Sequence, residues 1–244
     1  MEDTLKNISF TLQKGKITAL MGVNGTGKST LMNLLGGIAA LDRGAIRLDG
    51  QNLQNERFNV GYLRQEADLM LLADSVREEL CWNNKKISEA ELQTMLKRIG
   101  LENYAGDFPL ALSKGQRLRV ILSAVLMQKP KLLLLDEPTT GQDQQSLEEI
   151  KKLLCAYAEA GGSVFFCTHD VELASEIADS VILMNDGQII ADDITSKVLT
   201  DRSYLKLCGL KAPAMLDVTD LLHIRPLLTA KEVADYVLAA AVGR

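Results

Sequence analysis

Apolar residues recur along the chain in two periods, one typical of strands and one typical of helices. Near the start, Ile8, Phe10 and Leu12 alternate with polar residues, which predicts a strand with one buried face. A further strand is predicted at 45–48, between two glycines. Short continuous apolar runs predict the remaining strands, at 17–21, 132–135, 164–167 and 181–184.

Helix-capping sequences mark where most of the predicted helices begin. The pattern Ser-x-x-Glu or Ser-x-x-Gln begins at Ser75, Ser88 and Ser113, and in this pattern side chain and backbone bond each other at the helix start. A similar sequence begins at Thr229, before the final helix. Two more helices are predicted, at 28–35 and at about 144–160.

The order of these elements predicts the fold class. Strands and helices alternate on both sides of a helical insert at about 66–128, which indicates an α/β core with a mostly parallel sheet. The early strands and a hairpin signal at 185–187 predict a smaller antiparallel part. We therefore expect a core domain at 1–198, which contains the helical subdomain, and a helical C-terminal extension at 199–244.

Composition and charge narrow the class of protein. Hydrophobic residues make up 47% of the 244 residues, enough for a sizeable core, and no window of about 18 apolar residues predicts a membrane span. The net charge of −5 gives no basic footprint for nucleic acid, and the start of the chain has no signal-peptide pattern. Four widely spaced cysteines indicate reduced thiols, and two histidines are too few for an ordinary zinc site.

A glycine-rich loop follows the strand predicted at 17–21. Residues 22–29 fit the pattern G-x-x-x-x-G-K-[ST] at every fixed position. The glycines let backbone N–H groups point at phosphate oxygens, and the next helix aims its positive end at the same anion. Lys28 supplies a charge for the β- and γ-phosphates, and Ser29 supplies a hydroxyl for Mg²⁺. The predicted nucleotide-binding residues are Gly22, Val23, Asn24, Gly25, Thr26, Gly27, Lys28, Ser29 and Thr30.

Two carboxylates end another predicted strand. Residues 132–135 are leucines, and Asp136 and Glu137 follow directly. A central parallel strand delivers such groups at its carboxyl edge. Asp136 is then placed to hold Mg²⁺, and Glu137 to orient or deprotonate an attacking water. Together with the glycine-rich loop, the pair predicts nucleotide hydrolysis.

A third motif resembles one family in particular. Residues 112–116, L-S-K-G-Q, resemble the LSGGQ signature of the ATPase subunits of ABC transporters, and the resemblance covers essentially the whole chain. Ser113 is predicted to cap a helix whose N-terminus can face a γ-phosphate. Lys114 replaces the first glycine and would add a cation beside that phosphate. The resemblance implies that Ser113, Gly115 and Gln116 face ATP held by a second chain, so that two chains sandwich two ATP molecules head to tail.

The resemblance implies roles for three more residues. Gln65 matches the family glutamine that reaches Mg²⁺ and the attacking water, and His169 matches the histidine that contacts the γ-phosphate. Asp143 matches the aspartate of a loop at 140–143. The family pattern thus implies ATP and Mg²⁺ as cofactors, with Gln65, Glu137 and His169 as catalytic residues and Gln65 also near the metal.

A finer resemblance is to the ATPases of energy-coupling-factor importers of vitamins and transition-metal ions. It rests on residues 75–80, 139–143 and 207–232. It implies polytopic membrane subunits as partners and a peripheral place on the cytoplasmic side of the cell membrane. Residues 66–79 would contact the membrane subunit, and their apolar stretch at 69–72 either forms that contact or packs the helical subdomain.

Other classes with the same core remain as alternatives. A soluble ATPase of iron–sulfur assembly fits the spacing, and only capture of a polytopic membrane protein would distinguish the two. A chromosome-organising ATPase would need a long coiled coil between Lys28 and Ser113, and a translation factor would carry two ATPase halves and a basic linker. A nucleotide-binding module without catalytic activity is disfavoured, because the chain has Glu137, Gln65 and His169. The transported substrate stays open, as does whether the second chain is a copy or a paralogue.

The segment before the glycine-rich loop holds one aromatic residue, Phe10. The ABC family usually stacks adenine on an aromatic residue of an upstream strand, whereas Phe10 lies on the strand that normally follows. We therefore expect a chain that is naturally short, trimmed, or one half of a longer tandem polypeptide. Without a stacking contact, which contributes about 1–3 kcal/mol in nucleic-acid platforms, ATP and GTP would bind within about tenfold of each other.

Overall fold

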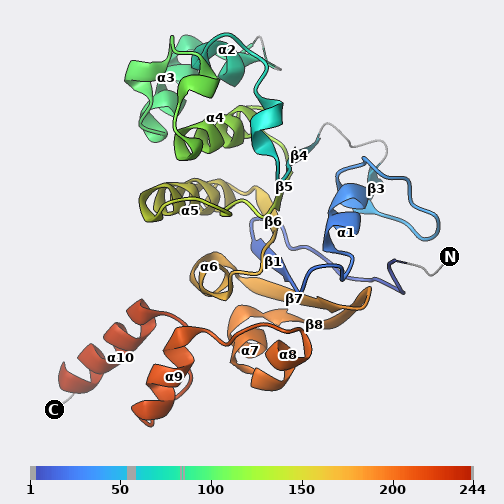
Figure 1. The fold of residues 1–244 in the computed structure, drawn as a ribbon, viewed down its shortest axis with the longest axis vertical. Helices are drawn as coiled ribbons and strands as arrows, with labels where there is room; N and C mark the ends of the chain where they lie inside the picture. The colour runs from blue at the N-terminus through green and yellow to red at the C-terminus, as the bar shows by residue number, and fades with distance from the viewer. Residues whose placement is uncertain (1–3, 54–58, 83, 85, 243–244) are drawn as a thin grey trace.

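A six-stranded sheet runs through the centre of the molecule in the order β4-β5-β6-β1-β7-β8 (Figure 1). The computed structural model describes residues 4–53, 59–82, 84 and 86–242. The strands of this sheet are β1 (Ile17–Met21), β4 (Val60–Leu63), β5 (Leu132–Asp136), β6 (Ser163–Cys167), β7 (Ser180–Asn185) and β8 (Gln188–Ile194). Neighbours run parallel except β7 and β8, which form the predicted hairpin at 185–187. The structure confirms an α/β fold with a mostly parallel sheet.

Helices cover both faces of this sheet. α1 (Lys28–Leu35) packs on one face, and α5 (Gln144–Glu159) and α6 (Val171–Ile177) pack on the other (Figure 1). Successive residues of a strand point to opposite faces, so β5 contributes Leu134 to the α1 side and Leu133 to the α5 side. Burial on both faces explains why the central strands read as continuous apolar runs.

A small hairpin, with two residues in each strand, forms a second sheet that is separate from the main one. β2 (Arg47–Leu48) pairs antiparallel with β3 (Gln51–Asn52), and the turn residues Asp49 and Gly50 both have positive φ. Two central residues with positive φ match the twist of a tight hairpin. The strand predicted at 45–48 is therefore confirmed in its second half.

The prediction of a strand at 8–12 is wrong, because this segment is irregular in the structure. Ile8, Phe10 and Leu12 are nevertheless half-buried against the core on the α1 side. The ring of Phe10 stacks on that of Phe165, with centroids 5.6 Å apart. The apolar face therefore forms by side-chain packing, without the regular hydrogen-bond ladder that defines a strand.

The helical insert lies at one end of the molecule (Figure 1). It consists of the 3₁₀ turns η3 (Ala67–Met70), η4 (Glu102–Tyr104) and η5 (Pro109–Ala111) and the helices α2 (Val76–Cys81), α3 (Glu89–Arg98) and α4 (Lys114–Leu126). Ser88 and Ser113 each form a reciprocal box with the residue three positions later, as predicted. Ser75 caps α2 through a single bond from the N–H of Glu78.

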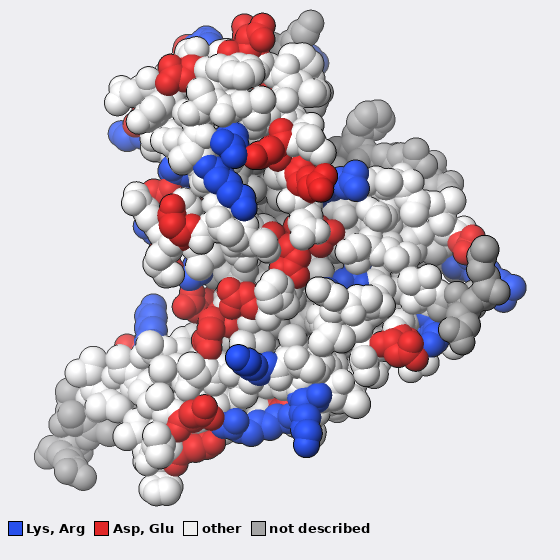
Figure 2. Space-filling view, viewed as in Figure 1, with Lys and Arg blue, Asp and Glu red and all other residues white. Residues whose placement is uncertain are grey.

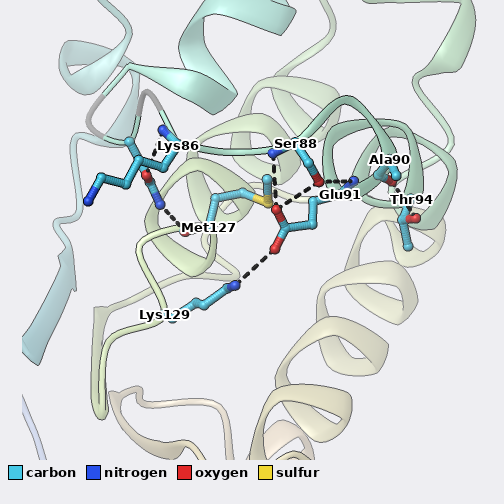
Figure 3. Close-up of polar contacts among 8 residues, drawn as sticks. Lys86, Ser88, Ala90, Glu91, Thr94, Met127 and Lys129 are labelled. Atoms are coloured by element: carbon cyan, nitrogen blue, oxygen red, sulfur yellow. Dashed lines mark hydrogen bonds and ion pairs between the residues drawn. The ribbon is translucent and has the colours of Figure 1, made fainter.

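Glu91 ties the start of α3 to the turn after α4. Its carboxylate accepts hydrogen bonds from the N–H and hydroxyl of Ser88 and, at 2.9 Å, from the Lys129 ammonium (Figure 3). The Lys129 bond first, and then the Ser88 bonds, lower the pKa of Glu91 to about 2. The start of α3 is thus bound to the short turn through which the chain passes from α4 to β5.

The chain ends in helices at the side opposite the insert (Figure 1). They are α7 (Thr195–Thr200), α8 (Arg202–Leu207), α9 (Ala214–Leu221) and α10 (Ala230–Val242). Thr229 and Glu232 bond each other's backbone N–H groups at the start of α10, as predicted. Among the described helices, none has the length and apolar character that spanning a membrane requires. Figure 2 shows acidic and basic side chains interspersed over the displayed face.

Candidate functional site

The glycine-rich loop 22–29 joins β1 to α1. Gly22 has φ 151° and Gly27 has φ 98°, conformations that favour glycine. A Cβ atom at Gly22 would collide with the carbonyl oxygen of Met184, and one at Gly27 would lie 2.7 Å from Cδ2 of Leu5. The loop therefore takes this shape because these two positions carry no side chain.

Lys28 places a buried charge inside the loop. The residue is 6% exposed, and its ammonium donates to the carbonyl oxygens of Gly22 at 2.8 Å and Val23 at 2.9 Å. The Thr26 hydroxyl donates to the Val23 oxygen as well, at 2.9 Å. Lys28 is also the first residue of α1, whose first N–H groups carry the positive end of the helix dipole. This arrangement suits a phosphate group.

Asp136 ends β5 next to the loop and is 8% exposed. Burial raises the pKa of its carboxyl above the ordinary value, and the neighbouring Glu137 raises it further. Hydrogen bonds from Cys167 and Ser29 and the charge of Lys28 oppose this rise without cancelling it. A cation at this carboxylate would favour its ionised form.

Glu137 and His169 form a pair at the ends of adjacent strands. Nδ1 of His169 lies 3.0 Å from both carboxylate oxygens of Glu137 and hydrogen-bonds Oε1. Oε2 is buried and has no aligned donor among the described residues. The backbone of Glu137 is left-handed, with φ 49°, and its N–H donates to the Cys167 oxygen at 3.0 Å. A non-glycine residue in this conformation costs on the order of 1–3 kcal/mol.

These groups share one edge of the sheet, at the carboxyl ends of four consecutive strands. Gln65 comes after β4, Asp136 ends β5 and Glu137 follows it, His169 comes after β6, and the loop 22–29 follows β1. The parallel register pairs Leu63 with Leu135, so Gln65, two residues beyond, is level with the residue that follows Asp136. The structure thus gathers residues that the sequence separates by more than a hundred positions.

The groups at this edge fit a nucleotide with Mg²⁺. The glycine cradle and the Lys28 ammonium suit a phosphate chain. The Ser29 hydroxyl and the Asp136 carboxylate are the hard oxygen ligands that Mg²⁺ prefers. No cluster of His, Cys, Asp and Glu side chains in the described ranges could hold a metal alone. Proteins usually hold Mg²⁺ through one or two oxygens together with substrate phosphates, a role for which Ser29 and Asp136 have suitable oxygens.

The signature residues 112–116 lie apart from this edge, at the start of α4. Ser113 caps the helix by accepting a bond from the N–H of Gln116. A Cβ atom at Gly115 would collide with the hydroxyl of Ser146, so glycine lets the first turn of α4 approach the first turn of α5. The signature turn is therefore packed against α5 of its own chain.

Two charged residues, Lys114 and Asp143, bind backbone groups near the contact between α4 and α5. The Lys114 ammonium donates to the carbonyl oxygen of Thr140 at 3.1 Å, so the cation expected beside a phosphate binds a carbonyl of its own chain here. Asp143 caps α5 through a bond from the N–H of Ser146 at 2.7 Å. This bond holds the pKa of Asp143 below its ordinary value. The loop between β5 and α5, which begins with Glu137, thus contacts the signature turn through Thr140.

Comparison with known proteins decides the family. The family model described as ABC transporter matches residues 5–140. The energy-coupling factor transporter ATP-binding protein EcfA of Methanosphaera stadtmanae is 34% identical over 224 residues, which cover 86% of this chain and 81% of that protein. The chain belongs to the ABC transporter ATP-binding family.

Other relatives agree with this family and differ in length. The protein EcfA2 of Methanospirillum hungatei JF-1 is 34% identical over 238 residues, covering 92% of this ABC chain and 60% of the relative. The chain spans only 35% to 39% of the length of three further curated relatives. A structure of cbiO1 from Clostridium perfringens, part of the ABC transporter complex cbiONQ, has a TM-score of 0.74 and 30% identity, and covers 91% and 92% of the two chains.

Sequence reasoning missed two neighbours of Asp136. Cys167 of β6 is aligned with Asp136 in the parallel register and hydrogen-bonds its carboxylate. The Tyr62 hydroxyl donates to Asn33 at 3.3 Å, and burial followed by the Asp136 charge raises the pKa of Tyr62 to about 12. Neither residue belongs to a motif, and only the register of β5 and β6 could have located Cys167.

The buried carboxyl of Asp136 generates a prediction for stability. Because its folded pKa lies above the ordinary value of 3.8, ionisation favours the unfolded chain as pH rises through the folded pKa. In the ABC chain without nucleotide or Mg²⁺, Asp136→Asn is therefore expected to increase the free energy of unfolding at pH 7. The gain should shrink as pH falls towards 4. Denaturant titrations at several pH values measure it.

Asp143→Asn is the matched control, since the pKa of Asp143 shifts downward and its ionised form is favoured by folding. This variant should not gain stability at pH 7. Equal unfolding free energies for Asp136→Asn and the unaltered chain at pH 7 would contradict the assigned cost of burial.

Proposed function

We propose that this chain is the ATP-hydrolysing subunit that energises a membrane transporter. The observation that carries the proposal is the single sheet edge at which Lys28, Asp136, Glu137, His169 and Gln65 converge. A phosphate cradle, a metal-binding carboxylate and a second carboxylate paired with a histidine are the parts that phosphoryl transfer to water requires. The family to which the chain belongs supports the same activity.

The residues around the loop bind and orient the nucleotide. Lys28 and the N–H groups at the start of α1 hold the phosphate chain. Ser29 and Asp136 hold Mg²⁺, which neutralises charge that develops on the phosphate oxygens. Because Asp136 resists ionisation when buried alone, binding of the cation and ionisation of the carboxylate favour each other.

The second carboxylate supplies the general base. Glu137 lies one residue beyond Asp136, and Oε2 has no aligned donor, so it can accept a hydrogen bond from a water and then its proton. His169 holds the other oxygen at 3.0 Å and, with 66% of its side chain exposed, can also reach the γ-phosphate. Gln65, on the neighbouring strand end, orients the same water.

Complete active sites would form between two chains. Ser113, Gly115 and Gln116 lie at a helix N-terminus that is separate from the glycine-rich loop of the same chain. We propose that they face the γ-phosphate held by a second ABC chain, a copy or a paralogue, in a head-to-tail pair. Asp143, in the loop that contacts the signature turn, would lie at this interface.

The membrane contact is assigned to the segment after Gln65. Leu69 is 75% exposed and Leu72 is 64% exposed, whereas Met70 and Leu71 pack against the helical core. Packing of the helical subdomain thus accounts for Met70 and Leu71, and Leu69 and Leu72 remain free for the proposed membrane contact. Exposed leucines on a turn suit an apolar helix of a polytopic membrane subunit. This subunit would anchor the chain peripherally on the cytoplasmic side of the membrane.

The likeness to EcfA and to cbiO1 supports an importer as the complex. These relatives are named as parts of energy-coupling factor and cbiONQ transporters, so we propose a vitamin or a transition-metal ion as the substrate class. The substrate would cross through the membrane subunits, since none of the described helices can span the bilayer.

The first test of the function is Glu137→Gln. Removing the general base should lower the turnover number for ATP by about 10²-fold or more while ATP binding persists. Steady-state hydrolysis and calorimetric titration in the purified membrane complex measure the two effects. Glu159→Gln, at the exposed end of α5, is the matched control and should leave both unchanged. Near-normal hydrolysis by Glu137→Gln would refute the assignment.

The second test concerns pairing of chains. With Mg-ATP, the Glu137→Gln variant should shift from monomer to dimer in sedimentation velocity, because uncleaved ATP keeps both signature turns engaged. Adding Lys28→Ala should abolish the shift, since the buried ammonium that holds the phosphates is lost. A chain that stays monomeric with Mg-ATP would exclude a pair of identical copies.

The third test concerns the exposed leucines. Leu72→Glu should weaken capture of the membrane subunits by at least about tenfold, because it places a charge in an apolar contact. Leu221→Glu is the control: Leu221 is 80% exposed on α9, at the other end of the molecule. Equal capture by both variants, with unchanged thermal unfolding, would place the contact elsewhere.

A further inference from the structure

Arg117 joins the start of α4 to Asp68, which lies 49 residues before Arg117 in the sequence. It stands in the first turns of α4, and its guanidinium donates from Nη1 to the Leu112 carbonyl oxygen at 2.7 Å and from Nη2 to Oδ2 of Asp68 at 2.8 Å. The Arg117 side chain is only 20% exposed. Because the guanidinium is planar and rigid, the two bonds fix the directions of both partners relative to each other.

Asp68 is one of two anchors of the turn that carries the exposed leucines. It lies in η3, three residues after Gln65. At the other end of the turn, the buried carboxylate of Glu79 accepts bonds from the N–H groups of Leu72 at 2.8 Å and Ala73 at 2.9 Å. Through these bonds, a displacement of the leucines can act on Arg117, on Glu79, or on both.

The two anchors lead to different parts of the molecule. Glu79 belongs to α2, so its bonds keep the turn attached within the helical insert. Arg117 holds the carbonyl of Leu112, the residue directly before Ser113, which caps α4. Of these two anchors, Arg117 is therefore the one that reaches the signature turn.

We propose that Arg117 is a positioning residue that couples the segment around Asp68 to the orientation of Ser113. The proposal rests on the proposed function, in which Ser113 faces ATP of a second chain and the exposed leucines contact a membrane subunit. In that setting, the Arg117–Asp68 pair makes ATP turnover depend on how the turn at η3 is held. Arg117 itself touches neither nucleotide nor metal.

The experiment is a double-mutant cycle in the purified membrane complex, with kcat and KM for ATP measured for each protein. Arg117→Met keeps most of the packed stem and removes both bonds, and Asp68→Asn removes the charge of the partner. Each is expected to lower kcat about fivefold or more with KM unchanged, a range typical of coupling between sites. The double variant should be no slower than the slower single variant, because both changes break one interaction.

Arg202→Met is the matched control. Arg202, at the start of α8, pairs with Asp217 and Asp220 of α9 at 2.8 Å, at the end of the molecule opposite the helical insert (Figure 1). Its kcat should stay within about twofold of the unaltered complex, as expected for an exposed ion pair. Thermal unfolding of all variants checks the fold, and Asp68→Asn carries the test if Arg117→Met does not fold.

Three outcomes would overturn the coupling: unchanged kcat in both single variants, losses that multiply in the double variant, or an equal loss in Arg202→Met. Each of these is separate from failure of the proposed function. The function fails if Glu137→Gln hydrolyses ATP normally, whatever Arg117 does. The coupling fails if Glu137→Gln is inactive while the Arg117 and Asp68 variants behave like the control.

Discussion

Burial of the central strands on both faces restricts where this chain can carry charge. β1 and β5 are buried at every position, so a charged side chain within them would lose its hydration without a compensating partner. The charged residue of β5 is the last residue of the strand, Asp136. Lys28 lies near the end of the glycine-rich loop that follows β1. Because parallel strands end at a common edge, this restriction brings the charged groups together in space.

The same restriction makes the site costly to fold. Asp136 is ionised less readily than an exposed aspartate, Glu137 adopts a left-handed backbone, and Oε2 of Glu137 lacks an aligned donor among the described residues. Each feature opposes folding of the chain alone. A cation at Asp136 would offset the first cost, and a water that donates to Oε2 of Glu137 would offset the last. The leucines that precede Asp136 in β5 offset the cost, since they are buried on both faces of the sheet. These costs fall at the sheet edge where the proposed ligands would bind.

The sequence predicts those parts of the fold that depend on neighbours in the chain. Glycines end α1, Ser88 and Ser113 form the predicted boxes, and the apolar run before Asp136 becomes a central strand. The predicted strand at 8–12 is wrong because a strand also needs a paired neighbour, which a period of two cannot reveal. Two contacts that the sequence did not predict also depend on residues distant in the chain: Lys114 binds the Thr140 oxygen, and Cys167 lies beside Asp136. These contacts depend on packing and on strand register, which no local pattern encodes.

The signature helix α4 explains how distant groups can act as one unit. Within its first two turns, Lys114 binds the loop after Glu137, Arg117 binds η3, and Arg119 donates to the Ile99 oxygen and pairs with Glu149 of α5. Arg119 is 9% exposed, so its pair is shielded from water and salt far more than a surface pair. A helix is stiff along its axis, because each turn is held by backbone bonds. A shift at η3 is therefore transmitted to the signature turn and the loop behind Glu137 together, while the buried Arg119 contact keeps α4 attached to the core.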